Sequence, residues 1–203
     1  MLADLGGGPL FIERGPQLAE ERLSLLLHVE SRDAMGANIV NTMSEHLLEL
    51  LVKAGLGRRM GAIITNAMPR RTTTASAKIP LSILEKGDVS GVDGAHGIVS
   101  MPEWASAEPY RAVTHNKGIM NGVTGVTLAT GNDTRAVEAA AHFYASRSGI
   151  YSPLSTWHVE GEVLTGTLTM PLPLGSVGGM TRLHPTVRLI MERLHIRSAR
   201  TIA

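Results

Sequence analysis

The 203-residue sequence contains no cysteine. This absence excludes disulfide scaffolds, thiolate zinc sites, iron–sulfur clusters and cysteine nucleophiles. It also favours a cytoplasmic protein, because disulfides belong mainly to oxidising compartments. No metal site is expected.

Aromatic residues, net charge and long apolar runs are scarce as well. Two Phe, two Trp and three Tyr leave the core to Leu, Ile, Val, Met and Ala. The net charge of +1 gives no strong field to attract nucleic acid or an anionic membrane. The apolar runs at 23–27 and 47–52 are far shorter than the roughly 18 residues of a membrane span, and no export signal is visible. The sequence therefore predicts a folded protein without nucleic-acid or membrane binding.

Hydrophobic periodicity predicts alternating strands and helices. Strands are expected at 23–30, 60–66, 75–81 and 164–170. Helices are expected at 40–54, 98–107, 133–146 and 185–194. The glycine-rich or turn-rich stretches 1–17, 85–97 and 110–122 are expected to be loops, and Glu160-Gly161 predicts a hairpin.

The turn at 33–38 lies between a predicted strand and a predicted helix. Helix N–H groups at such a place attract phosphate, and Gly36 lets a ligand approach the backbone. The alternative is that Asp33 and Asn38 only shape the turn and cap the helix. No G-x-G-x-x-G pattern is present, so the Rossmann fingerprint is missing.

The segment 110–122 has residue types that suit anion binding. Lys117 can stabilise an oxyanion and Arg111 can clamp a carboxylate, while His115 lies between them in the sequence. The alternative is two ordinary turns with a solvated lysine.

Asp133 lies at the start of a predicted helix, where capping is the simplest role. If it approaches Lys117, the two groups form a coupled pair. The glycine-rich run 171–179 is either a binding loop or a compact turn, and the residues alone do not decide between them.

Five motifs occur in the order and separation of a known family. They are Asp33-Ala-Met-Gly-Ala-Asn38, Val40-Asn-Thr-Met43, Thr114-His-Asn-Lys-Gly-Ile-Met-Asn121, Ala129-Thr-Gly-Asn-Asp133 and Gly178-Gly179. Together they resemble 3-hydroxy-3-methylglutaryl-CoA reductases, and most closely the bacterial, degradative-type class II enzymes. The resemblance runs from about Leu5 to the end of the chain.

The resemblance implies an oxidoreductase that interconverts 3-hydroxy-3-methylglutaryl-CoA with mevalonate and CoA, using two NAD(P)H, with NAD favoured over NADP. It implies that Lys117 stabilises the developing oxygen charge and that Asp133 hydrogen-bonds this lysine. Residues implied to line the substrate pocket are Asn66, Arg111 and Asn121. Residues implied to contact the cofactor are Asp33, Met35, Gly36, Asn38 and Thr42.

The family fold implies an α+β chain. A small ferredoxin-like cofactor domain, here 1–65, would join part of a larger helix-rich substrate and dimerisation domain, here 66–203. The active sites of the family lie at a dimer interface, so a homodimer is expected.

The catalytic glutamate and histidine of the family lie in motifs that have no match in this sequence. We therefore expect an internal fragment that lacks the N-terminal and C-terminal parts of the family and is inactive or nearly so alone. The alternative is a non-catalytic fragment that binds dinucleotide or acyl-CoA, or that oligomerises. A third reading is an unrelated phosphate-binding α/β protein.

Overall fold

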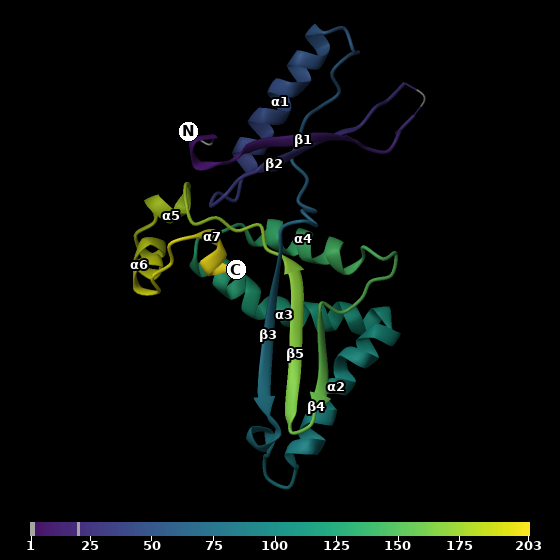
Figure 1. Cartoon of the computed structure of the whole chain (residues 1–203), viewed down its shortest axis with the longest axis vertical. Helices are drawn as coiled ribbons and strands as arrows, with labels where there is room; N and C mark the ends of the chain where they lie inside the picture. Colours follow the sequence, from purple (N-terminus) through teal and green to yellow (C-terminus); the bar gives the residue numbers. More distant parts are fainter. Residues whose placement is uncertain (1–2, 20) are drawn as a thin grey trace. The chain divides into compact units, whose positions relative to one another are not determined.

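The computed structural model describes residues 3–19 and 21–203 (Figure 1). The chain divides into two compact units. Unit 1 combines the described residues up to Thr65 with Leu174–Ile202, and unit 2 is Asn66–Pro173. The sequence predicted one division, between residues 65 and 66; in the structure the chain also returns to unit 1 after Pro173.

Unit 1 contains an antiparallel strand pair and several helices. Its elements are η1 (Ala3–Leu5), β1 (Gly8–Arg14), β2 (Leu25–Glu30), α1 (Ala37–Lys53), α5 (Met180–Leu183), α6 (Pro185–Arg193) and α7 (Ala199–Ile202). The two strands are joined by side chains as well as by the backbone ladder. The rings of Phe11 and His28 stack with centroids 4.2 Å apart, and His28 Nε2 lies 3.0 Å from a carboxylate oxygen of Glu13.

Unit 2 is a three-stranded sheet with helices on one face (Figure 1). Its elements are β3 (Thr72–Pro80), η2 (Leu81–Leu84), α2 (Gly91–Ala107), α3 (Pro109–Ala129), α4 (Thr134–Ala145), β4 (Ser155–Glu160) and β5 (Val163–Pro171). The strand order is β3-β5-β4, with both pairs antiparallel. Helix α2 packs on β4, α4 packs on β5, and α3 contacts both α2 and α4.

Because the sequence has few aromatic residues, the buried side chains are mainly Ala, Leu, Val and Met. Leu164 and Met170 of β5 are buried, and α4 adds a row of small side chains at 3.6-residue spacing. This row is Ala136, Val137, Ala140, Ala141 and Ala145. Short side chains let α4 lie close to its neighbours, which suits a chain with few aromatic residues.

Several predicted elements are confirmed, together with the α+β class. The predicted helices at 40–54, 133–146 and 185–194 correspond to α1, α4 and α6, and the strand at 23–30 corresponds to β2. The predicted hairpin joins β4 to β5, with Gly161 at φ 59° in its two-residue turn. Local caps and periodicity were sufficient at these places.

Other predictions were wrong. Residues 60–66 form no strand; the segment is held instead by a 2.7 Å hydrogen bond from Ile64 N–H to Asn41 Oδ1. The stretch 1–17, predicted as loop, contains β1, and α2 begins at Gly91, inside the predicted loop 85–97. The most important error is 110–122, which is helical throughout and belongs to α3. Packing against α2 and α4 offsets the low helix propensity of its glycines.

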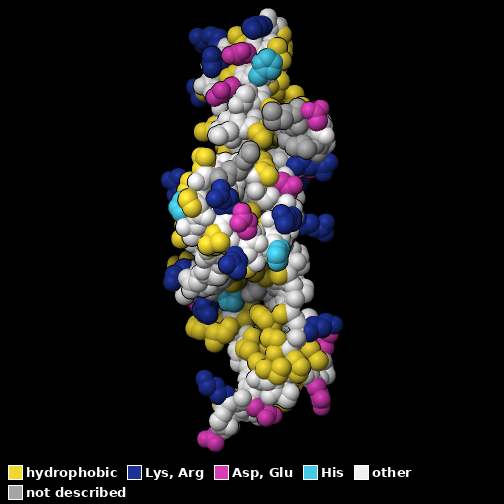
Figure 2. Space-filling view, turned by 90° about the vertical axis from the view of Figure 1, so that its left-hand side faces the viewer, with side chains coloured by type: hydrophobic (Ala, Val, Ile, Leu, Met, Phe, Trp, Pro, Cys, Tyr) yellow, Lys and Arg dark blue, Asp and Glu magenta, His cyan; other side chains and the backbone are white. Residues whose placement is uncertain are grey.

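Hydrophobic side chains also gather on one surface of unit 2. Figure 2 shows such side chains gathered in the lower part of the view. Ala75 and Ala77 of β3 are among the exposed hydrophobic residues of unit 2. No described helix combines the length and hydropathy needed to cross a membrane.

Candidate functional site

A cavity of about 250 Å³ lies between α3 and α4. Four of its residues come from α3 at helical spacing, and two come from α4, four positions apart. They are Lys117, Met120, Asn121, Thr124, Glu138 and His142. Both sets face the cavity because residues at i, i+3, i+4 and i+7 share one side of a helix. The cavity therefore combines a cation, a carboxylate, an imidazole, an amide and a hydroxyl.

One hydrogen bond joins the two helices that line this cavity. Thr124 Oγ1 donates a hydrogen bond of 3.2 Å to a carboxylate oxygen of Glu138 and so ties α3 to α4. Met120 is buried, whereas Lys117 and Asn121 are exposed one turn apart. The ammonium and the amide are thus available to a ligand on the same side of α3.

Asp133 caps α4, as the simplest sequence reading predicted. Its carboxylate accepts hydrogen bonds from the N–H groups of Arg135 and Ala136, at 3.0 and 3.1 Å. Lys117 lies about 18 Å before the end of α3, at 1.5 Å per residue. Among the ion pairs of the described residues, none joins Lys117 to Asp133. Within one chain, the two residues are therefore not brought together.

Arg111 and Asn66 also lie apart from the cavity lining. The guanidinium of Arg111 is 5.3 Å from the ring centroid of Trp104, and its Nη2 is 3.5 Å from the sulfur of Met101. This cation–π contact holds Arg111 against α2. Asn66 is exposed in the segment before β3.

His115 and Asn116 connect α3 to the segment that precedes and begins β4. His115 Nε2 lies 2.9 Å from Ser155 Oγ, and burial, with a smaller contribution from the Arg111 charge, lowers the pKa of His115. Asn116 is completely buried; its Nδ2 donates to Ser152 O, and its Oδ1 accepts from Leu154 N–H, both at 2.9 Å. Both side chains therefore bind to the segment around the start of β4 and do not line the α3–α4 cavity.

The predicted cofactor residues lie in unit 1, in the turn before α1 and in its first two turns. Gly36 is the N-cap of α1 with φ 102°, and a Cβ there would lie 2.8 Å from Ser31 Cβ. No side chain caps this helix, and no acidic residue occurs in its first turn. Asn38 and Thr42 are exposed four positions apart on α1. They therefore share one side of the helix.

The glycine-rich run 171–179 packs against this same turn. A Cβ on Gly175 would collide with the backbone N of Met35. Ser176 N–H donates to the carbonyl oxygen of Asp33 at 2.8 Å, and the Asp33 carboxylate accepts from Ala199 N–H, also at 2.8 Å. The turn at 33–38 is thus in contact with Gly175 and Ser176, and Asp33 joins three segments of unit 1.

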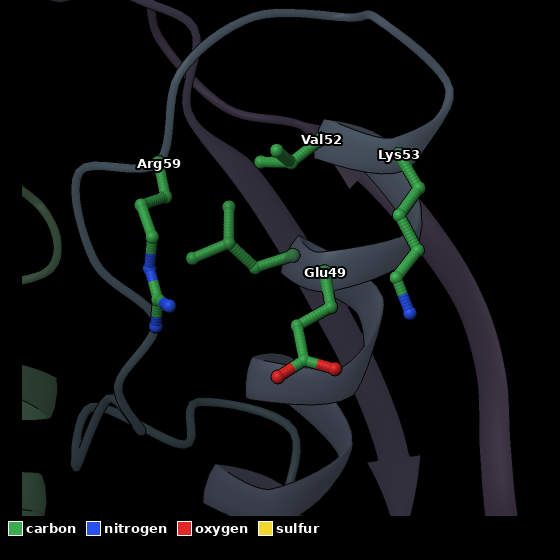
Figure 3. Close-up of a pocket in the computed structure, with 5 residues that line it drawn as sticks. Glu49, Val52, Lys53 and Arg59 are labelled. Atoms are coloured by element: carbon green, nitrogen blue, oxygen red, sulfur yellow. The ribbon is translucent and has the colours of Figure 1, made fainter.

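A second cavity, of about 130 Å³, lies at the C-terminal end of α1 (Figure 3). Its lining residues are Leu48, Glu49, Val52, Lys53 and Arg59. In Figure 3, Val52 points toward the segment that carries Arg59, and Lys53 lies on the other side of the helix. None of the predicted site residues lines this cavity. In the described part of the chain, no group of three His, Asp or Glu side chains is arranged to hold a metal ion.

Sequence reasoning missed four residues of the α3–α4 cavity, namely Met120, Thr124, Glu138 and His142. The spacing of Lys117, Asn121 and Thr124 would have indicated a common face if the segment had been predicted as helix. The spacing of Glu138 and His142 on the predicted helix 133–146 was a visible signal. The sequence contained no sign that these two helices are neighbours.

Comparisons with known families and structures agree on one family. A model described as hydroxymethylglutaryl-coenzyme A reductase matches residues 6–203. The 3-hydroxy-3-methylglutaryl-coenzyme A reductase of Archaeoglobus fulgidus is 37% identical over 206 residues, covering 100% of this chain and 46% of the relative. A probable 3-hydroxy-3-methylglutaryl-coenzyme A reductase of Borreliella burgdorferi is 35% identical over 174 residues, covering 86% of this chain and 40% of the relative.

A solved structure is similar over nearly the whole chain. The class II 3-hydroxy-3-methylglutaryl-CoA reductase from Streptococcus pneumoniae, bound to NADPH in open conformations, has a TM-score of 0.90 and 38% identity. The match covers 99% of this chain and 55% of that structure. This chain therefore spans about half the length of the proteins that it matches.

Proposed function

Because this chain belongs to the hydroxymethylglutaryl-coenzyme A reductase family, we propose that it supplies the lysine-bearing part of a reductase site. The proposed reaction interconverts 3-hydroxy-3-methylglutaryl-CoA with mevalonate and CoA. The observation that carries the proposal is the α3–α4 cavity, where Lys117 and Asn121 lie side by side on α3.

Lys117 is proposed to stabilise negative charge on the substrate oxygen. A carbonyl oxygen gains charge as its carbon is reduced, and an ammonium within hydrogen-bond distance lowers the energy of that state. Asn121 supplies an uncharged amide one turn away, suited to orienting a hydroxyl or a carbonyl oxygen. Asn66 and Arg111 remain proposed substrate residues, and their distance from the cavity lining gives them no added support.

The cofactor is proposed to bind at the start of α1. Support comes from the uncapped helix terminus, the absence of acidic residues in its first turn and Gly36 at the N-cap. Gly175 packs against the backbone of Met35 and so holds the turn before α1 in place. These features suit a dinucleotide phosphate. Asp33, Met35, Asn38 and Thr42 would orient the cofactor, which supplies hydride when it is bound.

Both NAD and NADP fit this proposal. The predicted preference for NAD gains no support from the comparisons, since the similar Streptococcus pneumoniae structure is bound to NADPH. A cytoplasmic location is part of the proposal and rests on the lack of cysteine.

A homodimer is proposed to complete the site. Small residues make one exposed stripe along α3, namely Gly118, Gly122, Gly125 and Ala129. A Cβ on any of the three glycines would meet nothing within 4 Å, so another helix can approach closely. Lys117 and Asp133 are equally far from Gly125 in the sequence. An antiparallel crossing of two α3 helices near Gly125 would therefore bring the lysine of one copy toward the aspartate of the other.

The test is turnover by the purified chain, followed at the nicotinamide absorbance band. Mevalonate and CoA are supplied with NAD and, separately, with NADP. We expect Lys117→Ala to abolish any turnover and Lys86→Ala, a surface lysine outside the cavity, to leave it unchanged.

If the chain gives no turnover, binding of 3-hydroxy-3-methylglutaryl-CoA and NADPH decides between the remaining readings. Binding that Lys117→Ala weakens would favour a non-catalytic fragment that holds the ligands. Binding that Lys117→Ala leaves intact, or no binding of either ligand, would contradict the proposal.

A further inference from the structure

His142 and Tyr151 form a pair at the α3–α4 cavity that the proposed function does not use. His142 lines the cavity from the last turn of α4. Its Nδ1 lies 2.7 Å from the hydroxyl of Tyr151, and the two rings have centroids 6.0 Å apart with planes inclined by 26°. This hydrogen bond fixes the orientation of the imidazole.

The segment that carries Tyr151 is itself held on both sides. Ser152 N–H donates to the carbonyl of Ala145, at the end of α4, at 2.9 Å. The buried amide of Asn116, on α3, bonds to Ser152 O and to Leu154 N–H. Asn116 directly precedes Lys117 in the sequence. The backbone that places Tyr151 is therefore anchored to the same helix that carries the lysine.

The other ring nitrogen of His142 is available to a ligand. Among the described residues, no hydrogen-bond partner occurs for Nε2, while the ring lines the cavity. The 2.7 Å contact allows either direction, and the inference uses the tautomer in which the tyrosine hydroxyl donates to Nδ1 and the imidazole hydrogen is on Nε2. In this tautomer Nε2–H is a donor that faces the cavity.

We infer that His142, oriented by Tyr151, is a further substrate-binding residue, whose Nε2–H donates to a carboxylate or carbonyl oxygen of an acid held in the Lys117 cavity. The inference rests on the proposed function for the class of ligand, a short hydroxy acid or its thioester. The cavity of about 250 Å³ suits this size. It equals the volume of roughly eight liquid waters at about 30 Å³ each.

Groups from each packed element face the imidazole: Lys117 from α3, Glu138 from α4, and Tyr151 from the segment after α4. The Lys117 ammonium attracts the carboxylate of a bound acid, and the Nε2–H of His142 donates to one of its oxygens.

The experiment is calorimetric titration of mevalonate into the full chain at about pH 7. We expect His142→Gln to weaken binding about tenfold, as for loss of a hydrogen bond to a charged carboxylate. Tyr151→Phe keeps the imidazole but releases its orientation, and a smaller loss, about threefold, is expected.

Matched controls come from the same unit. His158→Gln removes an exposed histidine on β4 that pairs with Glu160, and Tyr144→Phe alters a tyrosine that stacks with Arg147. Both should bind mevalonate like the unmodified chain.

Lys117→Ala separates this inference from the proposed function. If Lys117→Ala weakens binding while His142→Gln binds normally, the inference about His142 is wrong and the proposed function stands. If His142→Gln weakens binding and Lys117→Ala does not, the cavity holds an acid without the lysine and the proposed function is wrong. If the unmodified chain shows no mevalonate binding, both are wrong.

Discussion

Asp133 caps α4, and its negative charge is also proposed to act on Lys117. Substitutions at this position can test the two roles separately. The carboxylate caps α4 through two backbone N–H groups. Asparagine caps helices about as well as aspartate, whereas alanine loses about 1 kcal/mol. We expect Asp133→Asn to retain the urea midpoint and Asp133→Ala to lower the free energy of unfolding by about that amount.

Turnover in the same variants tests the charge. If the carboxylate acts on Lys117 in a dimer, both variants lose turnover, although only one loses stability. Full turnover by Asp133→Asn would show that the cap is sufficient and that the negative charge is not required.

His115 makes stability depend on pH. Burial, assisted by the Arg111 charge, lowers its pKa below the ordinary value of 6.5. The unfolded chain therefore binds a proton more readily than the folded chain. The stability due to the neutral imidazole is present above pH 6.5 and is lost as the pH falls through the lowered pKa of the folded state. We expect His115→Gln to reduce this loss, measured as urea midpoints between pH 5 and pH 8.

A His115→Gln variant with the same slope as the unmodified chain would count against a buried neutral imidazole at this position.

At the scale of elements, α2 contains one glycine that has no room for a side chain and one that has room. Gly91 begins the helix, and a Cβ there would collide with the carbonyl oxygen of Leu81. Gly97 lies within the helix, and a Cβ there meets nothing within 4 Å. We expect Gly91→Ala to destabilise the chain by about 1–3 kcal/mol and Gly97→Ala to stabilise it by about 1 kcal/mol. If the two variants change the free energy of unfolding equally in chemical denaturation, the close packing of Leu81 on Gly91 is contradicted.

The elements also show where local rules succeed. Helix α4 was predicted with its cap because Asp133, the apolar row and Gly149 all lie within a short stretch. Helix α3 was not predicted, because three glycines spaced along it resemble turns when each is considered alone. Its stability comes from α2 and α4, which pack on either side.

At the scale of the whole molecule, the proposed homodimer can be tested by mixing variants. If each site combines Lys117 of one copy with Asp133 of another, a mixed dimer of Lys117→Ala and Asp133→Ala contains one intact site. If the unmodified chain gives turnover, we expect the two variants, each inactive alone, to regain it when they are mixed and allowed to exchange subunits. Analytical ultracentrifugation should give the dimer a mass twice the 21.6 kDa of one chain.

A companion variant checks the proposed helix crossing. Gly122→Arg adds a long charged side chain to the exposed stripe of α3 and should yield monomers, whereas Gly97→Arg on α2 should not. Dimers that survive Gly122→Arg would place the interface elsewhere. Mixed variants that stay inactive would contradict sharing of the site.

The sequence by itself determined the family, the α+β class and the start of α4, because motif order and a side-chain helix cap are properties of neighbouring residues. It also pointed to Lys117 and Asn121, through motifs rather than through geometry. Only the tertiary structure decided that α3 is continuous, that Gly175 packs on Met35, and that Glu138 and His142 face Lys117. These contacts join residues far apart in the sequence. They form because packing between elements outweighs local preferences of about 1 kcal/mol per residue.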